Sequence, residues 1–208
     1  MLALPRYGLL ARFYDVLSGE RPVYRAGRVA GVAALQLQPG QRVLDLGCGT
    51  GLNFPLLLEG VAGRTDRGAV VGIDTSDAML TRARDKVSQH GWAGVQLVHA
   101  DTVSGAAELT GPFDAALFTY ALSVIGDWQA AWAAALERVR PGGRMLVVDM
   151  ALPVGRWRVL SPLARLACLT GGSDPHRHPW TLAERDLRDV THQVLRGGHV
   201  HVVSGVKP

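Results

Sequence analysis

The chain has 208 residues, 48% of them hydrophobic, which suffices for one domain with a sizeable core but not for two ordinary domains. Its formal net charge is only +4 and its arginines are scattered, so nucleic acid is not a favoured partner. Two cysteines cannot form a disulfide framework, and neither a cleavable signal peptide nor a long apolar span is visible, so we expect a cytoplasmic protein without a transmembrane segment.

The first 40 residues are expected to form a helical cap segment ahead of the first strand. The stretch RFYDVLSGERPVYRAGR is too polar to be pure core, and it places Tyr14, Tyr24 and Arg25 shortly before that strand. The two tyrosines suit amphipathic packing as well as a site that closes over a ligand. Both interpretations stay open at this point.

The segment VLDLGCGTG, residues 43–51, predicts a strand that passes through a glycine-rich turn into a helix. Glycine permits a tight turn and removes the Cβ that would keep a ligand away from the backbone. The dinucleotide fingerprint G-x-G-x-x-G is not met, because glycines stand at 47, 49 and 51 and Leu52 occupies the place of the third. The loop therefore indicates a ligand other than a pyrophosphate.

Two further side chains of this region have competing interpretations. Cys48 fits a small buried residue better than a reactive thiol, because the sequence supplies no basic partner. Asn53 suits an N-cap of the first helix as well as an approach to the ligand.

The second strand-like run, AVVGID, ends in Asp74. An acid at this strand tip can accept hydrogen bonds from both ribose hydroxyls of an adenosyl group, and its charge would repel a 2′-phosphate. With the glycine loop, it indicates an adenosine-containing ligand without phosphates. A helix is expected to begin after residues 75–77, with Met79, Leu80 and Ala83 on one side.

Hydrophobic runs of strand length alternate with helical segments along the chain, at about 42–46, 69–74, 95–100, 113–119 and 144–150. This alternation is typical of βαβ units and predicts an α/β protein with a doubly wound parallel sheet. Thr119 and Tyr120 follow the fourth run, at the edge where ligands bind in open sheets. They are therefore expected to line the site.

The remaining third of the chain departs from this alternation. Residues 151–190 contain several prolines and are expected to form an inserted substrate lid. Residues 190–205 predict two antiparallel strands joined around Gly197 and Gly198.

Taken in order, these motifs resemble the class I S-adenosylmethionine-dependent methyltransferases. The resemblance covers roughly residues 40–150 and rests on VLDLGCGTG, VVGIDTSDAMLTRAR, VQLVHADT, FDAALFTYALS and VRPGGRMLVVDM. It implies a seven-stranded, mostly parallel sheet with a C-terminal antiparallel hairpin, one domain over 1–208 with a cofactor-binding core at 41–150, and S-adenosyl-L-methionine as cofactor. The cofactor-binding residues that it implies are Asp45, Gly47, Cys48, Gly49, Gly51, Asp74, Thr75, Met79, Asp101, Thr102, Thr119 and Tyr120.

The resemblance also assigns roles to individual residues. Asp101 would accept a hydrogen bond from the adenine amino group while the Thr102 amide bonds the ring, unless Asp101 only caps the next helix. In small-molecule members of the family, tyrosine-containing N-terminal segments fold over the sulfonium and the substrate. Tyr14, Tyr24 and Arg25 are therefore candidate substrate-binding residues.

We expect no metal site. Asp174, His176 and His178 suit a solvated loop, because His-x-His without a distant cysteine or acidic partner has no recognised ligand geometry. The histidines of the C-terminal hairpin, His192, His199 and His201, are interpreted as structural or exposed. Trp128 and Trp132, four residues apart, predict a helix face packed on the sheet rather than an aromatic cage.

The acceptor class is narrowed by what the sequence lacks. The fourth strand is followed by TYAL, without the Pro-Pro-aromatic loop of amino-methylating nucleic-acid enzymes and without the nucleophilic cysteine of a cytosine carbon methylase. The remaining hypothesis is in-line methyl transfer to nitrogen or oxygen of a small-molecule or lipid-like acceptor. The alternatives are a non-catalytic adenosyl-binding sensor and a nicotinamide-dependent oxidoreductase, which the glycine spacing disfavours.

One segment bears on whether the protein contacts a membrane. In GRWRVLSPLARLACLT, tryptophan and leucines alternate with arginines at near-helical spacing. The pattern suits peripheral membrane contact as well as a lid helix with an arginine-rich outer face. The sequence identifies neither a general base nor an oligomeric state.

Overall fold

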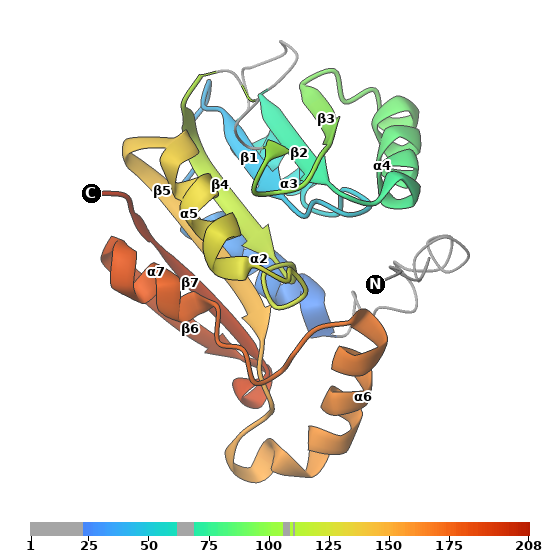
Figure 1. Cartoon of the computed structure of the whole chain (residues 1–208), viewed down its shortest axis with the longest axis vertical. Coiled ribbons are helices and arrows are strands. Elements are labelled where there is room, and N and C mark those ends of the chain that lie inside the picture. Colours follow the sequence, from blue (N-terminus) through green and yellow to red (C-terminus); the bar gives the residue numbers. More distant parts are fainter. Residues whose placement is uncertain (1–22, 62–68, 106–108, 110) are drawn as a thin grey trace.

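The computed structural model describes residues 23–61, 69–105, 109 and 111–208 (Figure 1). Seven strands form a single sheet in the order β3-β2-β1-β4-β5-β7-β6. β1 to β5 pair in parallel, whereas β7 runs antiparallel to both β5 and β6. This confirms the predicted fold class, including the C-terminal antiparallel pair. The strands are β1 (Val43–Leu46), β2 (Val70–Asp74), β3 (Val95–His99), β4 (Phe113–Thr119), β5 (Val139–Met150), β6 (Arg188–Leu195) and β7 (Val200–Val206).

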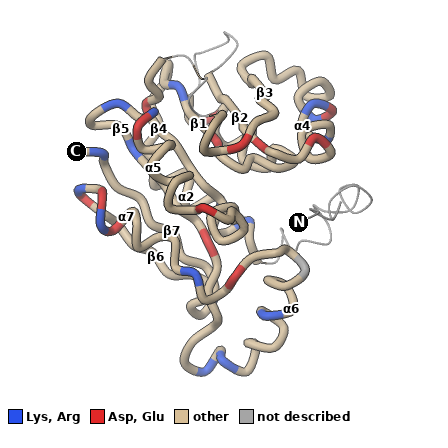
Figure 2. The backbone as a smooth tube through the Cα atoms, viewed as in Figure 1, with Lys and Arg blue, Asp and Glu red and all other residues tan. Residues whose placement is uncertain are grey.

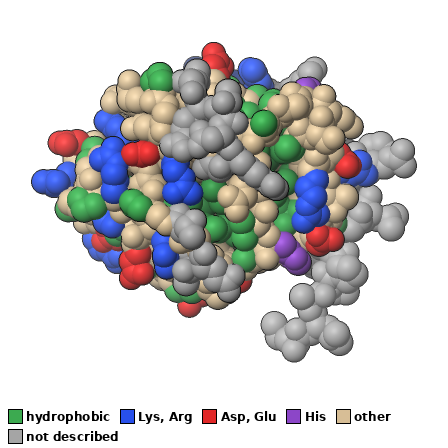
Figure 3. Space-filling view, turned by 90° about the horizontal axis from the view of Figure 1, so that it is seen from above, with side chains coloured by type: hydrophobic (Ala, Val, Ile, Leu, Met, Phe, Trp, Pro, Cys, Tyr) green, Lys and Arg blue, Asp and Glu red, His purple; other side chains and the backbone are tan. Residues whose placement is uncertain are grey.

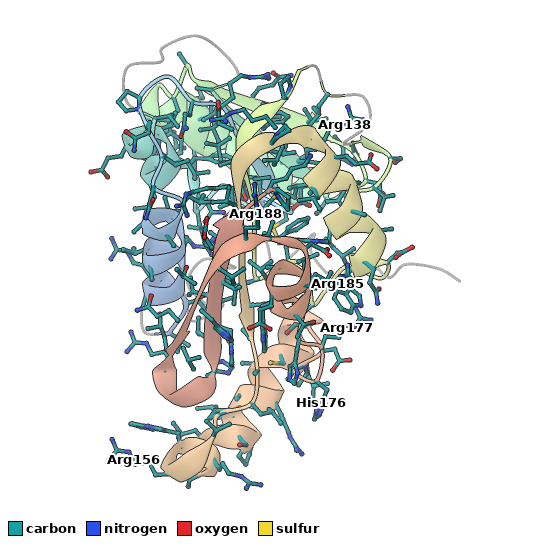
Figure 4. The ribbon with its side chains drawn as sticks, turned by 90° about the vertical axis from the view of Figure 1, so that its left-hand side faces the viewer. Arg138, Arg156, His176, Arg177, Arg185 and Arg188 are labelled. Atoms are coloured by element: carbon teal, nitrogen blue, oxygen red, sulfur yellow. The ribbon has the colours of Figure 1, made fainter. Side chains whose placement is uncertain are left out.

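Helices cover both faces of the sheet. The helices of one face are α2 (Arg25–Ala34), α3 (Phe54–Gly60) and α4 (Asp77–His90), and those of the other face are α5 (Trp128–Arg138) and α7 (Trp180–Asp186) (Figures 1 and 4). Successive strand residues point to opposite faces, so Val43 and Leu44 enter different core clusters. Because both faces of the central strands are buried, β1, β2 and β4 are nearly continuous apolar runs rather than alternating ones.

The predicted tryptophan face is confirmed on α5. Trp132 is fully buried against the sheet, next to Phe118 of β4. Its indole Nε1–H donates to Asp186 Oδ2 of α7 at 2.8 Å, so the polar end of the ring is satisfied within the helical layer.

The strand order reverses between β1 and β4, which makes their carboxyl ends the topological switch point of the sheet. Helix α2 lies close to this point because of Gly27. A Cβ there would sit 2.3 Å from Tyr120 Oη and 2.6 Å from Val200 Cγ1. Glycine therefore lets α2 approach the sheet and bring its polar side chains to the crevice.

The segment predicted as a substrate lid divides into two parts. Trp180, Leu182 and Ala183 of α7 are buried, and α7 contacts β5, β6 and β7, because its apolar face is covered by the sheet. This half therefore belongs to the helical layer instead of a lid. The other half, η3 (Gly155–Leu160) and α6 (Ser161–Gly171), projects beyond the end of β5 (Figure 1).

A short turn, η4 (Arg196–Gly198), joins β6 to β7, where the hairpin turn was predicted. Among the described helices, none combines the length and apolar character needed to cross a bilayer. Charges of both signs are intermixed on the face seen in Figure 3.

Candidate functional site

The glycine loop after β1 adopts a backbone that other residues rarely take. Gly47, Gly49 and Gly51 have φ of +68°, +55° and +79°. A Cβ at Gly47 would lie 2.7 Å from that of Ala121, and one at Gly51 would meet the ring of Phe54 at 2.4 Å. At Gly49, by contrast, nothing lies within 4 Å. The outer two glycines therefore serve packing, and the middle one faces open space.

The structure brings Asp74 to this loop, as the sequence predicts. Its Oδ2 accepts from the Gly49 N–H and its Oδ1 from the Ser76 N–H, each at 2.8 Å. Burial raises the pKa of the Asp74 carboxyl, and the backbone donors oppose that shift. A carboxylate offers about four lone-pair sites, so the group can also accept from a ligand hydroxyl.

Behind the loop lies a buried polar network. Asn53 Nδ2 lies 2.9 Å from both carboxylate oxygens of Asp45 and 2.8 Å from Thr119 Oγ1. Arg28 Nη1 donates to Asn53 Oδ1 at 2.7 Å and to Thr119 Oγ1 at 3.0 Å. Four side chains from α2, β1, β4 and the start of α3 thus hold one another, and Asp45 is fully buried beneath Asn53.

This network differs from the prediction in two residues. The Asn53 side chain makes no N-cap hydrogen bond, so the capping interpretation is wrong. Arg25, the predicted substrate residue, is exposed, whereas Arg28 is 9% exposed and enters the site. The signal for Arg28 is its helical spacing, because it lies four residues after Tyr24 and therefore on the same face of α2.

Burial raises the pKa of the Asp45 carboxyl to about 7, despite the hydrogen bond from Asn53 and the charge of Arg28. The folded state thus binds a proton that the unfolded state, with a pKa of 3.8, releases. This contribution to stability is complete at a pH below 3.8 and is lost as the pH rises through about 7, on the order of 4 kcal/mol in all.

We therefore expect the stability advantage of the wild-type protein over Asp45→Asn to shrink as the pH rises from 5 to 7.5. Denaturant unfolding of both proteins at several pH values measures this difference. The comparison cancels the contribution of Asp149, whose pKa burial raises to about 6, because both proteins retain it. A difference that stays constant with pH would contradict the assignment.

A second cluster lies where α2 meets β4 and β7. Tyr120 has a φ of +57°, unusual for a bulky residue, and its hydroxyl donates to the Tyr24 carbonyl at 2.8 Å. The Tyr24 and Tyr120 rings pack edge to face at 4.9 Å, and the Arg28 guanidinium lies 5.5 Å from the centre of the Tyr120 ring. Strained backbone of this kind is typical of functional sites.

His199, interpreted from the sequence as structural or exposed, is buried and completes this cluster. Its Nδ1 lies 2.6 Å from the Ala151 carbonyl oxygen, which can only accept, so Nδ1 carries the proton and Nε2 presents a lone pair. Nε2 lies 3.4 Å from Tyr24 Oη. Burial lowers the pKa of His199, so the ring is neutral at physiological pH.

The cluster opens into an apolar pocket of about 460 Å³. Tyr24 and His199 provide polar atoms on its wall, and Trp157, Leu160 and Leu163 of η3 and α6 provide much of its apolar lining. Such a pocket, mostly apolar with a few converging polar groups, has the size and character of a small-molecule site.

The other predicted cofactor residues are spread along the same edge. Thr75 is exposed and its carbonyl contacts His99 Nε2 at 3.0 Å, whereas Met79 and Thr102 are buried. Asp101 Oδ1 accepts from the backbone N–H groups of the turn that follows, at residues 103 and 104, as the capping alternative requires.

Two further predictions concern reactive groups. Cys48 is 6% exposed and burial raises the pKa of its thiol, which fits the packing interpretation. His176 and His178 are exposed, and no metal-binding group of three or more suitable side chains occurs among the described residues. Tyr14 lies outside the described residues.

The strand order and the glycine loop at the switch point define a Rossmann-like α/β protein. Residues 43–143 match the family model of a methyltransferase domain. The chain is 31% identical over 197 residues to the ubiquinone/menaquinone biosynthesis C-methyltransferase UbiE of Teredinibacter turnerae, covering 88% of this chain and 74% of that protein. The chain belongs to the class I S-adenosylmethionine-dependent methyltransferases.

Two other comparisons are more partial. The chain is 33% identical over 156 residues to UbiE of Vibrio campbellii, covering 73% of this chain but only 55% of that protein's length. A structure of Haemonchus contortus phosphoethanolamine N-methyltransferase 2, in complex with phosphomonomethylethanolamine and S-adenosylhomocysteine, has a TM-score of 0.71 at 15% identity, covering 99% of this chain and 61% of that one. At that identity, the likeness shows the fold alone.

Proposed function

We propose that the protein transfers a methyl group from S-adenosylmethionine to an apolar small molecule that carries a hydroxyl group. The observation that carries this proposal is the junction of two sites. Contacts run without a break from Asp74 and the glycine loop, through the network of Arg28, to the apolar pocket at His199. A methyl donor bound at the glycine loop and an acceptor bound in the apolar pocket would meet near Tyr120.

In this proposal, the chain's own residues position the methyl donor. Asp74 accepts from the ribose hydroxyls, and the amino-acid end lies along the loop at Gly49, where a side chain would obstruct it. Asp45, Asn53 and Arg28 hold the loop from behind. S-adenosylmethionine supplies the sulfonium methyl group, and the protein aligns the acceptor about 3–3.5 Å from it, opposite the sulfur.

His199 acts on the acceptor in this proposal. Its Nε2 lone pair accepts the hydroxyl proton while the acceptor attacks the methyl carbon and the sulfur leaves with the bonding electron pair. The products are the methylated acceptor, S-adenosylhomocysteine and a proton that the imidazolium returns to water. Loss of the hydroxyl proton activates the oxygen itself or, in an aromatic ring, the carbon beside it.

The relatives favour a ring acceptor. The UbiE proteins are named as C-methyltransferases of ubiquinone and menaquinone biosynthesis, and a hydroxylated ring suits an apolar pocket with one base. Carbon thus joins the oxygen and nitrogen predicted from the sequence as a possible acceptor atom. The cytoplasmic location expected from the sequence is part of this proposal.

The test is isothermal titration with S-adenosylmethionine and S-adenosylhomocysteine, followed by incubation with labelled methyl donor and a native lipid extract. Mass spectrometry should find label in an apolar hydroxylated molecule. Label in a hydrophilic amine would contradict the acceptor class. Cofactor binding without turnover across a broad acceptor panel would instead support the alternative, a non-catalytic adenosyl-binding sensor.

We expect His199→Gln to lower kcat by about 100-fold or more, since it removes the base, while the cofactor Kd stays unchanged. Ala164→Trp, which fills the pocket from α6, should raise the acceptor KM with the same cofactor Kd. His176→Gln, on an exposed loop, is the matched control. Equal rates for the His199 and His176 variants would exclude His199 as the general base.

A further inference from the structure

We propose that residues 154–169, which comprise Val154, η3 and most of α6 and are called the projection below, form a docking surface for an anionic lipid bilayer. Of the eleven large hydrophobic side chains exposed in the described part of the chain, seven lie within these residues. Val159, Leu163 and Leu169 are 78%, 67% and 72% exposed. Contiguous exposed apolar surface of this kind marks a contact with a partner or a membrane.

The charge of the projection favours an anionic bilayer as its binding partner. Residues 150–173 contain three arginines, Arg156, Arg158 and Arg165, and no acidic residue. All three are exposed, and the tube of Figure 2 shows only basic positions along η3 and α6. Arg156 points outward at the tip (Figure 4). Apolar side chains bordered by arginines alone match the acyl and headgroup layers of an anionic bilayer.

The helix is oriented for such contact. Ala164 and Cys168, one turn apart on α6, are buried, whereas Leu163, Leu166 and Leu169 are all more than half exposed. Among the described elements, α6 makes its main contacts with η3. The projection is therefore free to enter the interfacial layer without disturbing the sheet, and Pro162 at its start is compatible with the first turn of the helix.

The docking surface also borders the acceptor pocket. Trp157, Leu160 and Leu163 belong to both, so the pocket lies directly beneath the proposed membrane contact. This placement would let an apolar acceptor pass from the bilayer to His199 without crossing bulk water, an inference that rests on the proposed function. Membrane docking does not depend on that function, because it involves only the exposed residues.

The experiment is co-sedimentation of the full chain with vesicles of phosphatidylglycerol and phosphatidylcholine mixed, against phosphatidylcholine alone. We expect binding to the anionic vesicles that falls at high salt. The double variant Leu166→Glu/Leu169→Glu should reduce the bound fraction at least tenfold, and Arg156→Glu/Arg158→Glu should abolish the preference for anionic lipid. Neither pair lines the acceptor pocket. Val194→Glu, an exposed valine on β6, is the matched control and should bind like wild type.

Titration with S-adenosylmethionine verifies that each variant is folded. Absence of vesicle binding by a cofactor-binding wild-type protein overturns the proposal, as does equal binding by the Leu166/Leu169 and Val194 variants. A dimer in sedimentation velocity that dissociates in the leucine variant identifies a second copy as the occupant and also overturns it. Vesicle binding without methyl transfer leaves the docking surface intact and contradicts the proposed function alone.

Discussion

Replacement of Asp74 by alanine should raise the Kd for S-adenosylmethionine by about 30-fold or more, equivalent to the loss of ~2 kcal/mol. Hydrogen bonds to a charged acceptor are stronger than neutral ones, and Asp74 would accept two from the ribose. The substitution also removes the acceptor of the Gly49 and Ser76 N–H groups, so the glycine loop loses its tie to β2. Isothermal titration with the cofactor and its demethylated product measures the effect.

Asp77→Ala is the control for this experiment. Asp77 lies three residues further on, at the start of α4, where its exposed carboxylate pairs with Arg84 at 3.2 Å. Such a surface pair contributes little, so we expect unchanged binding. Asp74→Asn keeps one acceptor oxygen and should fall between the two. Wild-type affinity in Asp74→Ala would remove the basis for an adenosyl site.

The second large effect is expected for Arg28→Ala. This change leaves Asn53 Oδ1 without its buried donor and removes one of the two donors to Thr119 Oγ1, which costs about 1–3 kcal/mol of folding stability. It also removes the positive charge that holds down the pKa of Asp45. Because the network supports the loop, we expect the cofactor Kd to rise about tenfold as well. Chemical denaturation and titration measure the two effects separately.

Substitution of the neighbouring Arg25 is the control for Arg28→Ala. Arg25→Ala removes the same side chain from the exposed face of α2 and should change stability by less than about 0.5 kcal/mol. Arg28→Lys retains the charge but not the planar guanidinium, whose Nη1 donates to both acceptors and which lies against the Tyr120 ring, so an intermediate loss is expected. Equal stability of the Arg25 and Arg28 alanine variants would show that the buried network does not support the loop.

Much of the fold was predictable because its signals are local. Strand-length apolar runs alternating with helices give the parallel sheet, and Gly197 and Gly198 mark the turn of the hairpin. The glycines at 47, 49 and 51 have the positive φ that only glycine adopts freely, so the residue type itself indicates the backbone conformation. Asp74 follows from its place at a strand tip.

The lid and the Asn53 cap show where local patterns mislead. A proline-rich stretch predicts irregular structure, yet α7 packs on the sheet because β7, inserted between β5 and β6, exposes an apolar surface that requires cover. Asn53 occupies a cap position, but its Oδ1, the atom that would cap the helix, accepts from Arg28 instead, and its amide nitrogen donates to Asp45. Burial favours those partners, since an unsatisfied carboxylate would cost more than an uncapped helix.

Local sequence patterns suffice to predict the doubly wound sheet, the glycine loop and Asp74, because periodicity and backbone conformation depend on neighbouring residues. Long-range packing is needed to learn that Arg28 rather than Arg25 enters the site, and that His199 faces Tyr24 from 175 residues away. The reason is physical: a side chain's partners, exposure and protonation depend on which distant elements the packed sheet brings beside it.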